Sequence, residues 1–360
     1  MRILVIGAGN GGAAAAVELS LAGHEVCLYA RSASTLDPFA SEGIGFEGLL
    51  GEGRLRPSGL TSDLAMAIAD AEAAVVALPV YAHGAVARAL AEAGWGATRP
   101  IILNPGHTGG VFEFETAYRA VRGELPPLAE FSTLAYVARK PRPDVVNITG
   151  RAKALRAASL PSGRAALELA CVLFPGAYDS GDVIATGLSN VNMIVHPPGA
   201  MLGASWSEAT GGDFTFYVEG MTPGVMHVMR ALDAERIAVA AAFGHVLPTV
   251  IGEMRALGTV PADADPDDYR AIAAGAANRL IKAPDTLDHR YYVEDFGHGL
   301  VPFTVIARIA GVATPVADAL IALCTIARGR GEVATRGAAE MGLVGCSRDA
   351  LLARVGVTST

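Results

Sequence analysis

The sequence predicts an α/β protein with an N-terminal Rossmann-type domain, built on a parallel sheet, and an all-helical C-terminal domain. In the first half, short apolar strands alternate with helices, a pattern typical of a parallel sheet with right-handed crossovers. Glycine-rich residues 43–59 indicate a small β excursion from it. From about residue 186 onward, nearly every segment has helical spacing, with proline or glycine between segments. We therefore expect a dinucleotide-binding domain over residues 1–185 and a helical domain, with the substrate and catalytic groups, over residues 186–360.

The N-terminal residues have the order strand, glycine turn, helix, strand. Residues 2–6 are apolar and include β-branched side chains, as in a buried strand. Residues 13–22 are rich in alanine and are followed by Gly23, the residue favoured just beyond a helix C-terminus. Residues 24–29 are the second strand. In this context a G-x-G-x-x-G turn predicts dinucleotide binding.

The turn itself spans residues 7–12 and reads GAGNGG. Gly7 is expected to make the tight turn, Gly9 to let the backbone approach a pyrophosphate, and Gly12 to let helix pack on strand. The helix N-terminus adds free N–H groups and the positive end of its dipole. The alternative is a glycine turn that serves packing alone. We expect cofactor contacts from Gly7, Gly9, Asn10, Gly11 and Gly12.

The end of the second strand indicates which nicotinamide cofactor is bound. NAD enzymes of this fold place an acidic residue here for the ribose 2′-hydroxyl. The sequence has no acid at this place but has Arg31 and Ser32, which suit a 2′-phosphate. NADP is therefore favoured over NAD, which stays open. The alternative is that Arg31 stacks on the adenine without touching a phosphate.

Two later strands, residues 73–80 and 101–103, contribute loops at the same edge of the predicted sheet. Ligands of open parallel sheets bind beyond the carboxyl ends of the strands. The nicotinamide half of the site is therefore expected to be lined by Leu78, Pro79, Asn104 and Gly106.

The composition excludes several classes of function. The net charge of −8 argues against nucleic acid or an anionic membrane as the main partner. The four cysteines are scattered, without a CxxC pair or Cys/His cluster, so neither a disulfide framework nor a metal site is expected. The longest apolar stretch, residues 237–252, contains His245 and Pro248 and is no membrane span. We expect a cytoplasmic protein, and the apolar helices are compatible with a homodimer.

Two stretches of the second half carry residues suited to catalysis. His196 lies in NVNMIVHPP, an apolar helical run whose proline pair is expected to open the helix locally. The other stretch, DHRYYVEDFGHGLVP, contains Arg290 and Asp295. An arginine fork is a natural clamp for a carboxylate, and an aspartate can orient a histidine. The plain alternative is a satisfied core histidine and a charged helix start before a glycine-rich loop.

With these motifs the sequence resembles the opine dehydrogenases of the octopine/nopaline type. The resemblance covers nearly the whole chain, through GAGNGG, NVNMIVHPP, FYVEGMTPGV, LDAERIAVA, KAPDTLDHRYYVEDFGHGLVP and GVATP in the same order. It implies an NAD(P)H-dependent condensation of an L-amino acid with a 2-oxo acid, through an imine that is then reduced. By this resemblance the catalytic histidine falls on His196, the substrate-clamping arginine on Arg290 and the orienting aspartate on Asp295.

The chain departs from that family at two places, so the particular amino and oxo acids stay open. Phe-Gly-His follows the acidic dipeptide, and Glu253-Met254 stands where the family often has a tryptophan. Two other functions stay open: a two-domain reductase of a 2-oxo or hydroxy acid, similar to ketopantoate or glycerol-3-phosphate reductases, and a non-catalytic NADP-binding sensor. His298 competes with His196 for the catalytic role. We predict that His196 and Asp295 lie within hydrogen-bonding distance.

Overall fold

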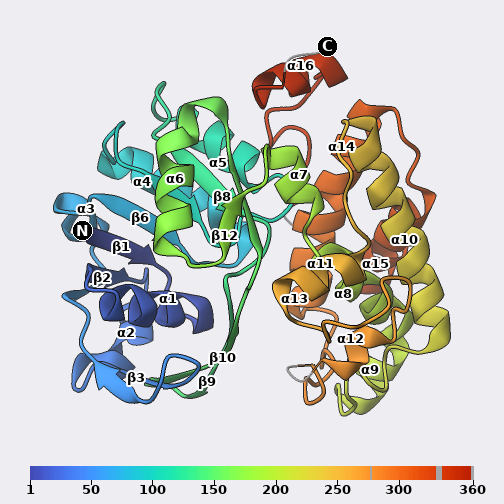
Figure 1. Ribbon diagram of the computed structural model, residues 1–360, viewed down its shortest axis with the longest axis horizontal. Coiled ribbons are helices and arrows are strands. Elements are labelled where there is room, and N and C mark those ends of the chain that lie inside the picture. The colour runs from blue at the N-terminus through green and yellow to red at the C-terminus, as the bar shows by residue number, and fades with distance from the viewer. Residues whose placement is uncertain (276–277, 330–334, 358–360) are drawn as a thin grey trace. The chain divides into compact units, whose positions relative to one another are not determined.

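Strand β1 (Arg2–Ile6) pairs in parallel with β2 (Glu25–Tyr29) on one side and with β6 (Ala73–Val76) on the other. The computed structural model describes residues 1–275, 278–329 and 335–357 (Figure 1). The larger sheet has the strand order β12-β11-β8-β7-β6-β1-β2-β5. Its neighbours run parallel except for β8 and β11, which are antiparallel. The predicted parallel sheet is therefore confirmed.

The chain divides into two units. The first contains Met1–Gly106 and Gly110–Gly181, and the second contains His107–Gly109 and Asp182–Thr360. This division lies a few residues before the boundary expected near residue 185. It also assigns to the second unit a tripeptide that the sequence analysis placed in the first.

The elements of the first unit, beside β1, β2 and β6, follow in chain order: α1 (Asn10–Leu21), α2 (Ala33–Ala40), β3 (Ile44–Gly48), β4 (Gly53–Leu55), β5 (Gly59–Thr61), α3 (Leu64–Ala69), the 3₁₀ helix η1 (Val80–Ala82), α4 (His83–Ala93), β7 (Ile101–Leu103), α5 (Gly110–Arg119), β8 (Leu128–Phe131), β9 (Tyr136–Arg142), β10 (Val145–Arg151), β11 (Leu155–Ser159), the 3₁₀ helix η2 (Pro161–Gly163), α6 (Arg164–Leu173) and β12 (Ala177–Asp179).

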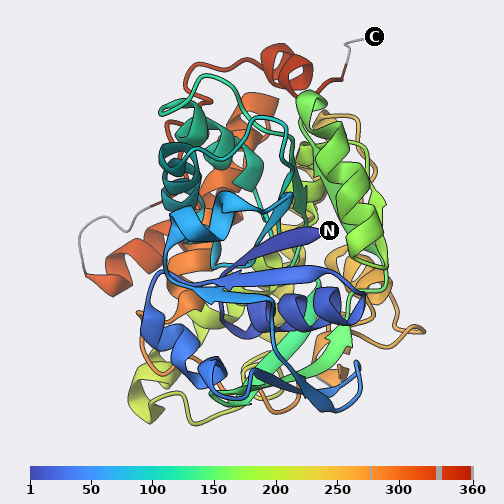
Figure 2. The ribbon, with the colours of Figure 1, turned by 90° about the vertical axis from the view of Figure 1, so that its left-hand side faces the viewer.

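A smaller sheet, with the order β4-β3-β10-β9, accompanies the larger one. Helix α1 lies between the two, packed on β1 and β2 on one side and on β9 and β10 on the other (Figure 2). The buried Glu18 of α1 fastens this layer, since it accepts a hydrogen bond of 2.6 Å from the Tyr136 hydroxyl and pairs with Arg151. The β excursion expected over residues 43–59 is thus part of a sheet completed by strands about a hundred residues later in the chain.

The described part of the second unit is built from helices, beside one isolated bridge between Thr215 and Lys282. They are α7 (Val183–Leu188), α8 (Asn192–Leu202), α9 (Ala204–Thr210), α10 (Pro223–Ala242), α11 (Val250–Leu257), α12 (Ala271–Ala274), α13 (Arg290–Asp295), the π helix η3 (Phe296–Leu300), α14 (Val301–Ala310), α15 (Pro315–Arg328) and α16 (Arg348–Arg354). In the parts of the chain that are described, no helix is both long and apolar enough to span a membrane.

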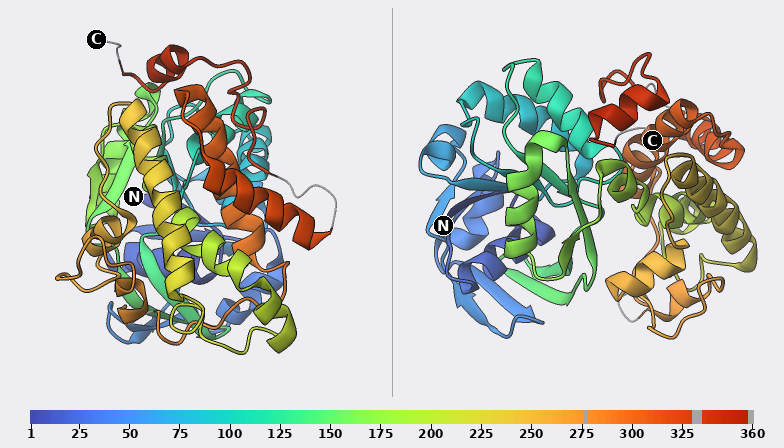
Figure 3. Two further views of the ribbon diagram at one scale, coloured as in Figure 1. Left: turned by 90° about the vertical axis from the view of Figure 1, so that its right-hand side faces the viewer. Right: turned by 45° about the horizontal axis from the view of Figure 1, so that its top comes forward.

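Helix α8 is the core element of this unit, in contact with α10, α13, α15 and η3. The long helix α10 runs beside α14 and α15 (Figure 3). Residues Met193 to Ala200 of α8 are buried throughout. The helix continues through Pro197 and Pro198 to Leu202, so the expectation that this pair opens the helix is wrong. Contacts on all sides of α8 offset the hydrogen bonds that the two prolines cannot donate.

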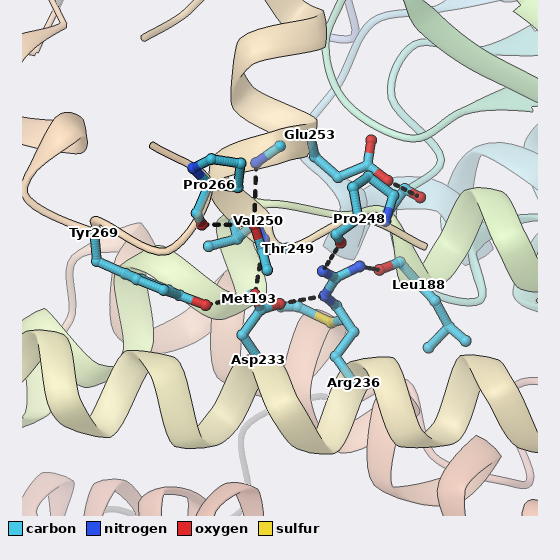
Figure 4. A network of polar contacts seen from close by, with 12 residues as sticks. Leu188, Met193, Asp233, Arg236, Pro248, Thr249, Val250, Glu253, Pro266 and Tyr269 are labelled. Atoms are coloured by element: carbon cyan, nitrogen blue, oxygen red, sulfur yellow. Dashed lines mark hydrogen bonds and ion pairs between the residues drawn. The ribbon is translucent and has the colours of Figure 1, made fainter. Parts of the chain in front are cut away.

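Arg236 of α10 is a fully buried cation that ties three segments together (Figure 4). Its Nε donates to Asp233 Oδ1 at 2.6 Å, one helical turn away. The other guanidinium nitrogens donate to the carbonyls of Leu188, at 3.2 Å, and Pro248, at 2.6 Å. The charge is therefore both paired and hydrogen-bonded, as a buried charge has to be.

The other carboxylate oxygen of Asp233 accepts two hydrogen bonds from later parts of the chain. Oδ2 accepts from the Val250 amide and from the Tyr269 hydroxyl, each at 2.7 Å (Figure 4). Burial and the adjacent carboxylate raise the pKa of Tyr269, so this phenol stays a donor. Nearby, the buried Glu253 accepts a bond of 3.0 Å from Ser189, which gives this departure from the family pattern a structural role.

Arg236→Met should destabilise the helical unit strongly, because it leaves Asp233 as a buried charge without its cation. Breaking one side of a buried pair costs about 3–5 kcal/mol. Urea unfolding measures the loss. Arg270→Met, which removes a surface arginine paired with Asp268, is the control and should leave the midpoint unchanged. Equal midpoints for the two variants would show that the network is dispensable.

Candidate active site

The glycine turn after β1 is built for close approach of the backbone. Gly7 has φ +114°, and a Cβ there would lie 2.5 Å from the Ala77 carbonyl oxygen. A Cβ on Gly12 would lie 1.7 Å from the carbonyl oxygen of Gly7, so only glycine lets α1 start so close to the strand. Gly9 is different, since a Cβ there would meet nothing within 4 Å. The exposed backbone at Gly9 is therefore open to an incoming group.

Helix α1 begins at this turn without a side-chain cap. Its N-cap is Gly9, which offers no side-chain hydrogen bond to the first turn, to which Asn10 and Gly11 belong. Free N–H groups and the helix dipole favour an anion at such an end. The turn thus fits the pyrophosphate of a dinucleotide.

The other predicted cofactor residues follow neighbouring strands of the larger sheet. Arg31 and Ser32 come after β2, and both are exposed. Leu78 and Pro79 come after β6, half-buried and exposed respectively. Because β7, β6, β1 and β2 are adjacent and parallel, the residues after them share one edge of the sheet.

Asn104 and Gly106, after β7, are buried and take part in the sheet structure. Asn104 Oδ1 accepts from the Ala135 amide at 2.9 Å, while its Nδ2 has no partner among the described residues. The Gly106 amide donates to the Phe131 carbonyl at 2.9 Å. Asn104 keeps a free donor for a ligand, whereas the backbone of Gly106 is already engaged.

His196 and Asp295 form the hydrogen bond that we predicted. Nδ1 of the ring lies 2.8 Å from Asp295 Oδ2, although the residues are 99 positions apart. Their side chains are only 7% and 1% exposed, so this bond is shielded from water. Asp295 is the last residue of α13, which packs on α8 and thereby aligns the two side chains.

Two tyrosines that the sequence analysis did not single out complete the surroundings of His196. The Tyr217 hydroxyl lies 2.8 Å from Nε2, so both ring nitrogens are engaged. The Tyr291 ring stacks on the imidazole, with centroids 3.9 Å apart and planes at 21°. Both lie in stretches that carried the family resemblance, FYVEGMTPGV and DHRYYVED, but nothing in their spacing pointed to His196.

Arg290 begins α13 and is available to an anionic ligand. Its side chain is 55% exposed, and Nε lies 3.4 Å from the buried carboxylate of Glu294. Burial lowers the pKa of Arg290, but Glu294 and Asp295 outweigh this and the net pKa is raised. The guanidinium therefore stays charged, at the opposite end of α13 from Asp295, the residue that bonds His196.

Two further histidines lie near this group. His298 is buried within η3, directly after Asp295 and Phe296. His107 is buried with a left-handed backbone, φ +58°, and its Nε2 has no partner among the described residues. Burial lowers the pKa of His107 well below its ordinary value, and Arg290 and Arg336 add to this. The sequence analysis missed His107, for which the loop NPGHTGG is the only local signal.

The arrangement can move protons and hold an anion. An imidazole oriented by a carboxylate is a general acid–base, and the neighbouring guanidinium suits a carboxylate ligand. Among the described residues, no group of three or more His, Cys, Asp or Glu side chains could hold a metal ion.

Comparison with known families assigns both halves of the chain. Residues 179–328 match the alpha-helical domain of NAD/NADP octopine/nopaline dehydrogenases. Residues 2–98 match the family of coenzyme F420-dependent NADP oxidoreductases, which accords with the dinucleotide-binding fold of the first unit.

Individual proteins give the same result. The chain is 35% identical over 323 residues to an opine dehydrogenase of Arthrobacter sp. (strain 1C), which covers 89% of this chain and 88% of that protein. An octopine dehydrogenase structure with NADH and L-arginine has a TM-score of 0.77 at 20% identity, covering 100% of this chain and 99% of the other. Yersinopine dehydrogenase with NADP⁺ has a TM-score of 0.72 at 15% identity, with 98% and 95% covered. The chain therefore belongs to the opine dehydrogenase family of NAD(P)-dependent oxidoreductases.

Proposed function

We propose that this enzyme joins the amino group of an L-amino acid to the carbonyl carbon of a 2-oxo acid and reduces the resulting imine at the expense of NADPH. The observation that carries the proposal is the buried His196–Asp295 pair with Arg290 on the same helix as the aspartate. The nicotinamide, when bound, supplies the hydride. The relatives named above include enzymes studied with an amino acid and with NADH or NADP⁺.

In this proposal each residue has a separate task. Arg290 binds a substrate carboxylate through its planar fork. His196 takes part in removing a proton from the ammonium group and in returning one to the departing hydroxyl. Asp295 accepts from Nδ1–H, which fixes the tautomer and orientation of the ring. General acid–base catalysis of this kind contributes about 10²–10⁴-fold to the rate.

The choice of NADPH rests on the residues after β2. Arg31 and Ser32 are exposed, and Ser32 is the N-cap of α2 without using its side chain for capping. An arginine and a hydroxyl can together bind a 2′-phosphate, whereas NAD recognition in this fold uses an acid at this place.

Two other parts of the proposal concern the setting of the enzyme. The cysteines of the chain, all free and none in a disulfide, suit the reducing cytoplasm. Leu323 and Ile326 are exposed on one face of α15, 51% and 75% respectively, and favour a homodimer. Sedimentation equilibrium of the purified enzyme tests the dimer, and a monomer at micromolar concentration would exclude it.

The alternative of a reductase without an amine substrate has less support. Reductases similar to ketopantoate reductase are expected to use a lysine as the acid, and the lysines here are Lys140, Lys153 and Lys282. Lys282 pairs on the surface with Asp213. A sensor without turnover would have no need of a shielded histidine–carboxylate pair.

Between the two candidate bases, electrostatics favours His196. Burial and Arg336 lower the pKa of His298 to about 3, so this ring is neutral at physiological pH. A base with so low a pKa cannot hold a proton taken from an ammonium group.

The function is tested by NADPH oxidation with pyruvate and a mixture of L-amino acids, with each omitted in turn. His196→Ala should abolish amine-dependent turnover, and Asp295→Asn should lower it by about 10²–10⁴-fold, because the ring loses its fixed tautomer. The double variant should be little worse than His196→Ala, since the residues act as one unit. NADPH affinity should be unchanged throughout. Turnover without the amino acid would refute the proposed condensation.

Arg31→Asp should raise the Kd for NADPH about ten- to hundredfold, the value of a charge-assisted hydrogen bond of about 1.5–3 kcal/mol, and leave NADH binding no weaker. Nucleotide fluorescence measures both constants. Arg139→Asp, at an exposed position on β9, is the matched control for the charge change. If the two variants bind NADPH equally well, Arg31 has no contact with the phosphate.

The protonation state of His298 predicts a pH dependence of stability. The pKa falls from 6.5 to about 3 on folding, so between these values only the unfolded chain binds the proton. The resulting stabilisation is complete above pH 6.5 and is lost by about 1.4 kcal/mol per pH unit below it. Urea unfolding between pH 6.5 and 5 should therefore show a shallower loss for His298→Gln than for the wild type. Equal slopes would restore His298 as a candidate base.

A further inference from the structure

Both ring nitrogens of His196 are occupied in this structure. The Asp295 carboxylate only accepts, so Nδ1 carries the proton of the neutral ring and the lone pair lies on Nε2. That lone pair accepts the hydroxyl proton of Tyr217, 2.8 Å away. The Tyr291 ring covers one face of the imidazole at 3.9 Å. A substrate therefore has no direct access to Nε2 while the bond to Tyr217 exists.

We propose that Tyr217 is a catalytic residue of this reaction: its hydroxyl meets the reacting amine and hydroxyl groups and carries their protons to and from His196. This inference rests on the proposed function and adds a third member to the His196–Asp295 pair.

The backbone around Tyr217 is held on both sides, which favours a fixed relay over a side chain that swings aside. The Phe216 amide donates to the Ile281 carbonyl, and the Ala283 amide to the Phe214 carbonyl, both at 2.9 Å. Glu219 Oε2 accepts from the backbone amide of Thr215 at 2.6 Å. The segment is thus paired with residues 281–283, and the bond between Thr215 and Glu219 closes a turn around Tyr217.

Close packing against α8 fixes the side chains too. A Cβ on Gly199 would lie 2.8 Å from the tip of the Phe216 ring, so a larger residue at this point of the helix would push the ring aside. Phe216 and Tyr217 pack edge to face, with centroids 5.1 Å apart and planes at 89°. Tyr217 is 7% exposed. Its hydroxyl is therefore held at His196 by the same helix that carries the histidine.

The phenol also lies within electrostatic range of the proposed carboxylate clamp. Burial lowers the pKa of Arg290, whereas Glu294, Asp295, Tyr291 and then Tyr217 raise it. Because the Arg290 side chain is more than half exposed, a carboxylate can reach it from solvent. The amine or carbonyl of a substrate held there is only a few bonds from the bound carboxylate.

The relay balances for each step. The ammonium group gives a proton to the Tyr217 oxygen while the Tyr217 proton passes to Nε2, so the phenol is unchanged and His196 becomes an imidazolium beside Asp295. The free amine attacks the carbonyl carbon: the C–N bond forms, the C=O π bond opens, and one proton passes from this nitrogen to the oxygen, which becomes the hydroxyl. Reversal of the relay then protonates the departing hydroxyl; the C–O bond breaks, water leaves and the iminium remains. Two of the three ammonium protons end in that water molecule.

Tyr217→Phe tests the relay, because it removes the hydroxyl and keeps the ring. We expect kcat to fall about a hundredfold, within the range of general acid–base catalysis, with unchanged NADPH affinity. The dependence of kcat on the fraction of D₂O should be curved in the wild type, as for two protons moving together, and linear in the variant. By ¹⁵N NMR without substrate, the His196 Nε2 resonance should shift in the variant, since Nε2 no longer accepts the hydroxyl hydrogen bond.

Tyr292→Phe is the matched control. It removes another buried hydroxyl of the same unit, which donates to the Ala200 carbonyl at 2.7 Å, and should alter neither the D₂O curve nor the His196 Nε2 resonance. A Tyr217→Phe enzyme with unchanged kcat, or with raised kcat/KM, would overturn the relay and show that the hydroxyl only blocks the histidine. A wild-type enzyme without amine-dependent turnover would instead refute the proposed function, and the relay with it.

Discussion

The helical unit depends on the buried pair of Asp233 and Arg236. Neither charge reaches water, so each must be satisfied by the chain, and the two carbonyls, the amide and the phenol that do so come from three segments outside α10. Desolvation of the pair is offset only while all these partners are present. One of them, the Leu188 carbonyl, ends α7 just before α8 begins. The charge pair of α10 is thus hydrogen-bonded to the segment directly before α8, the helix that carries His196.

A second constraint is the helical run from α13 through η3 to α14. The π turn at Phe296–Leu300 follows Asp295 immediately and buries every one of its residues. Such turns are rare and tend to occur at functional sites, because they shift the helix register locally. Asp295, just before this turn, bonds His196 of α8, while burial and the nearby Arg336 lower the pKa of His298 within the turn. The departure of this chain from the usual family sequence, Phe-Gly-His, therefore lies in a π turn directly after the carboxylate that bonds His196.

The sequence predicted the features that arise from local patterns and missed most of those that arise from contacts between residues far apart in the chain. The strands β1, β6 and β7 were recognisable because strands buried on both faces are continuous apolar runs. The His196–Asp295 pair was expected from motifs of the family, which already contain long-range information. The β excursion over residues 43–59 was also expected, but its pairing with β10 was not, since the paired strands are about a hundred residues apart. Tyr217 and His107 were missed for the same reason: a single tyrosine or histidine has no periodicity, and only the folded chain brings it to His196.

The assignment of His107–Gly109 to the helical unit has a consequence for how such chains recombine. Thr108 accepts from Asn190 at 3.2 Å and from Arg336 at 2.7 Å, and donates to the Gly187 carbonyl at 3.0 Å. The tripeptide is nevertheless encoded between β7 and α5 of the other unit. A chimera of two relatives joined once, at Gly181–Asp182, would combine a foreign tripeptide with a native helical half. Exchange of cofactor domains within the family therefore requires three junctions, and these three residues should diverge in step with the C-terminal half of the gene.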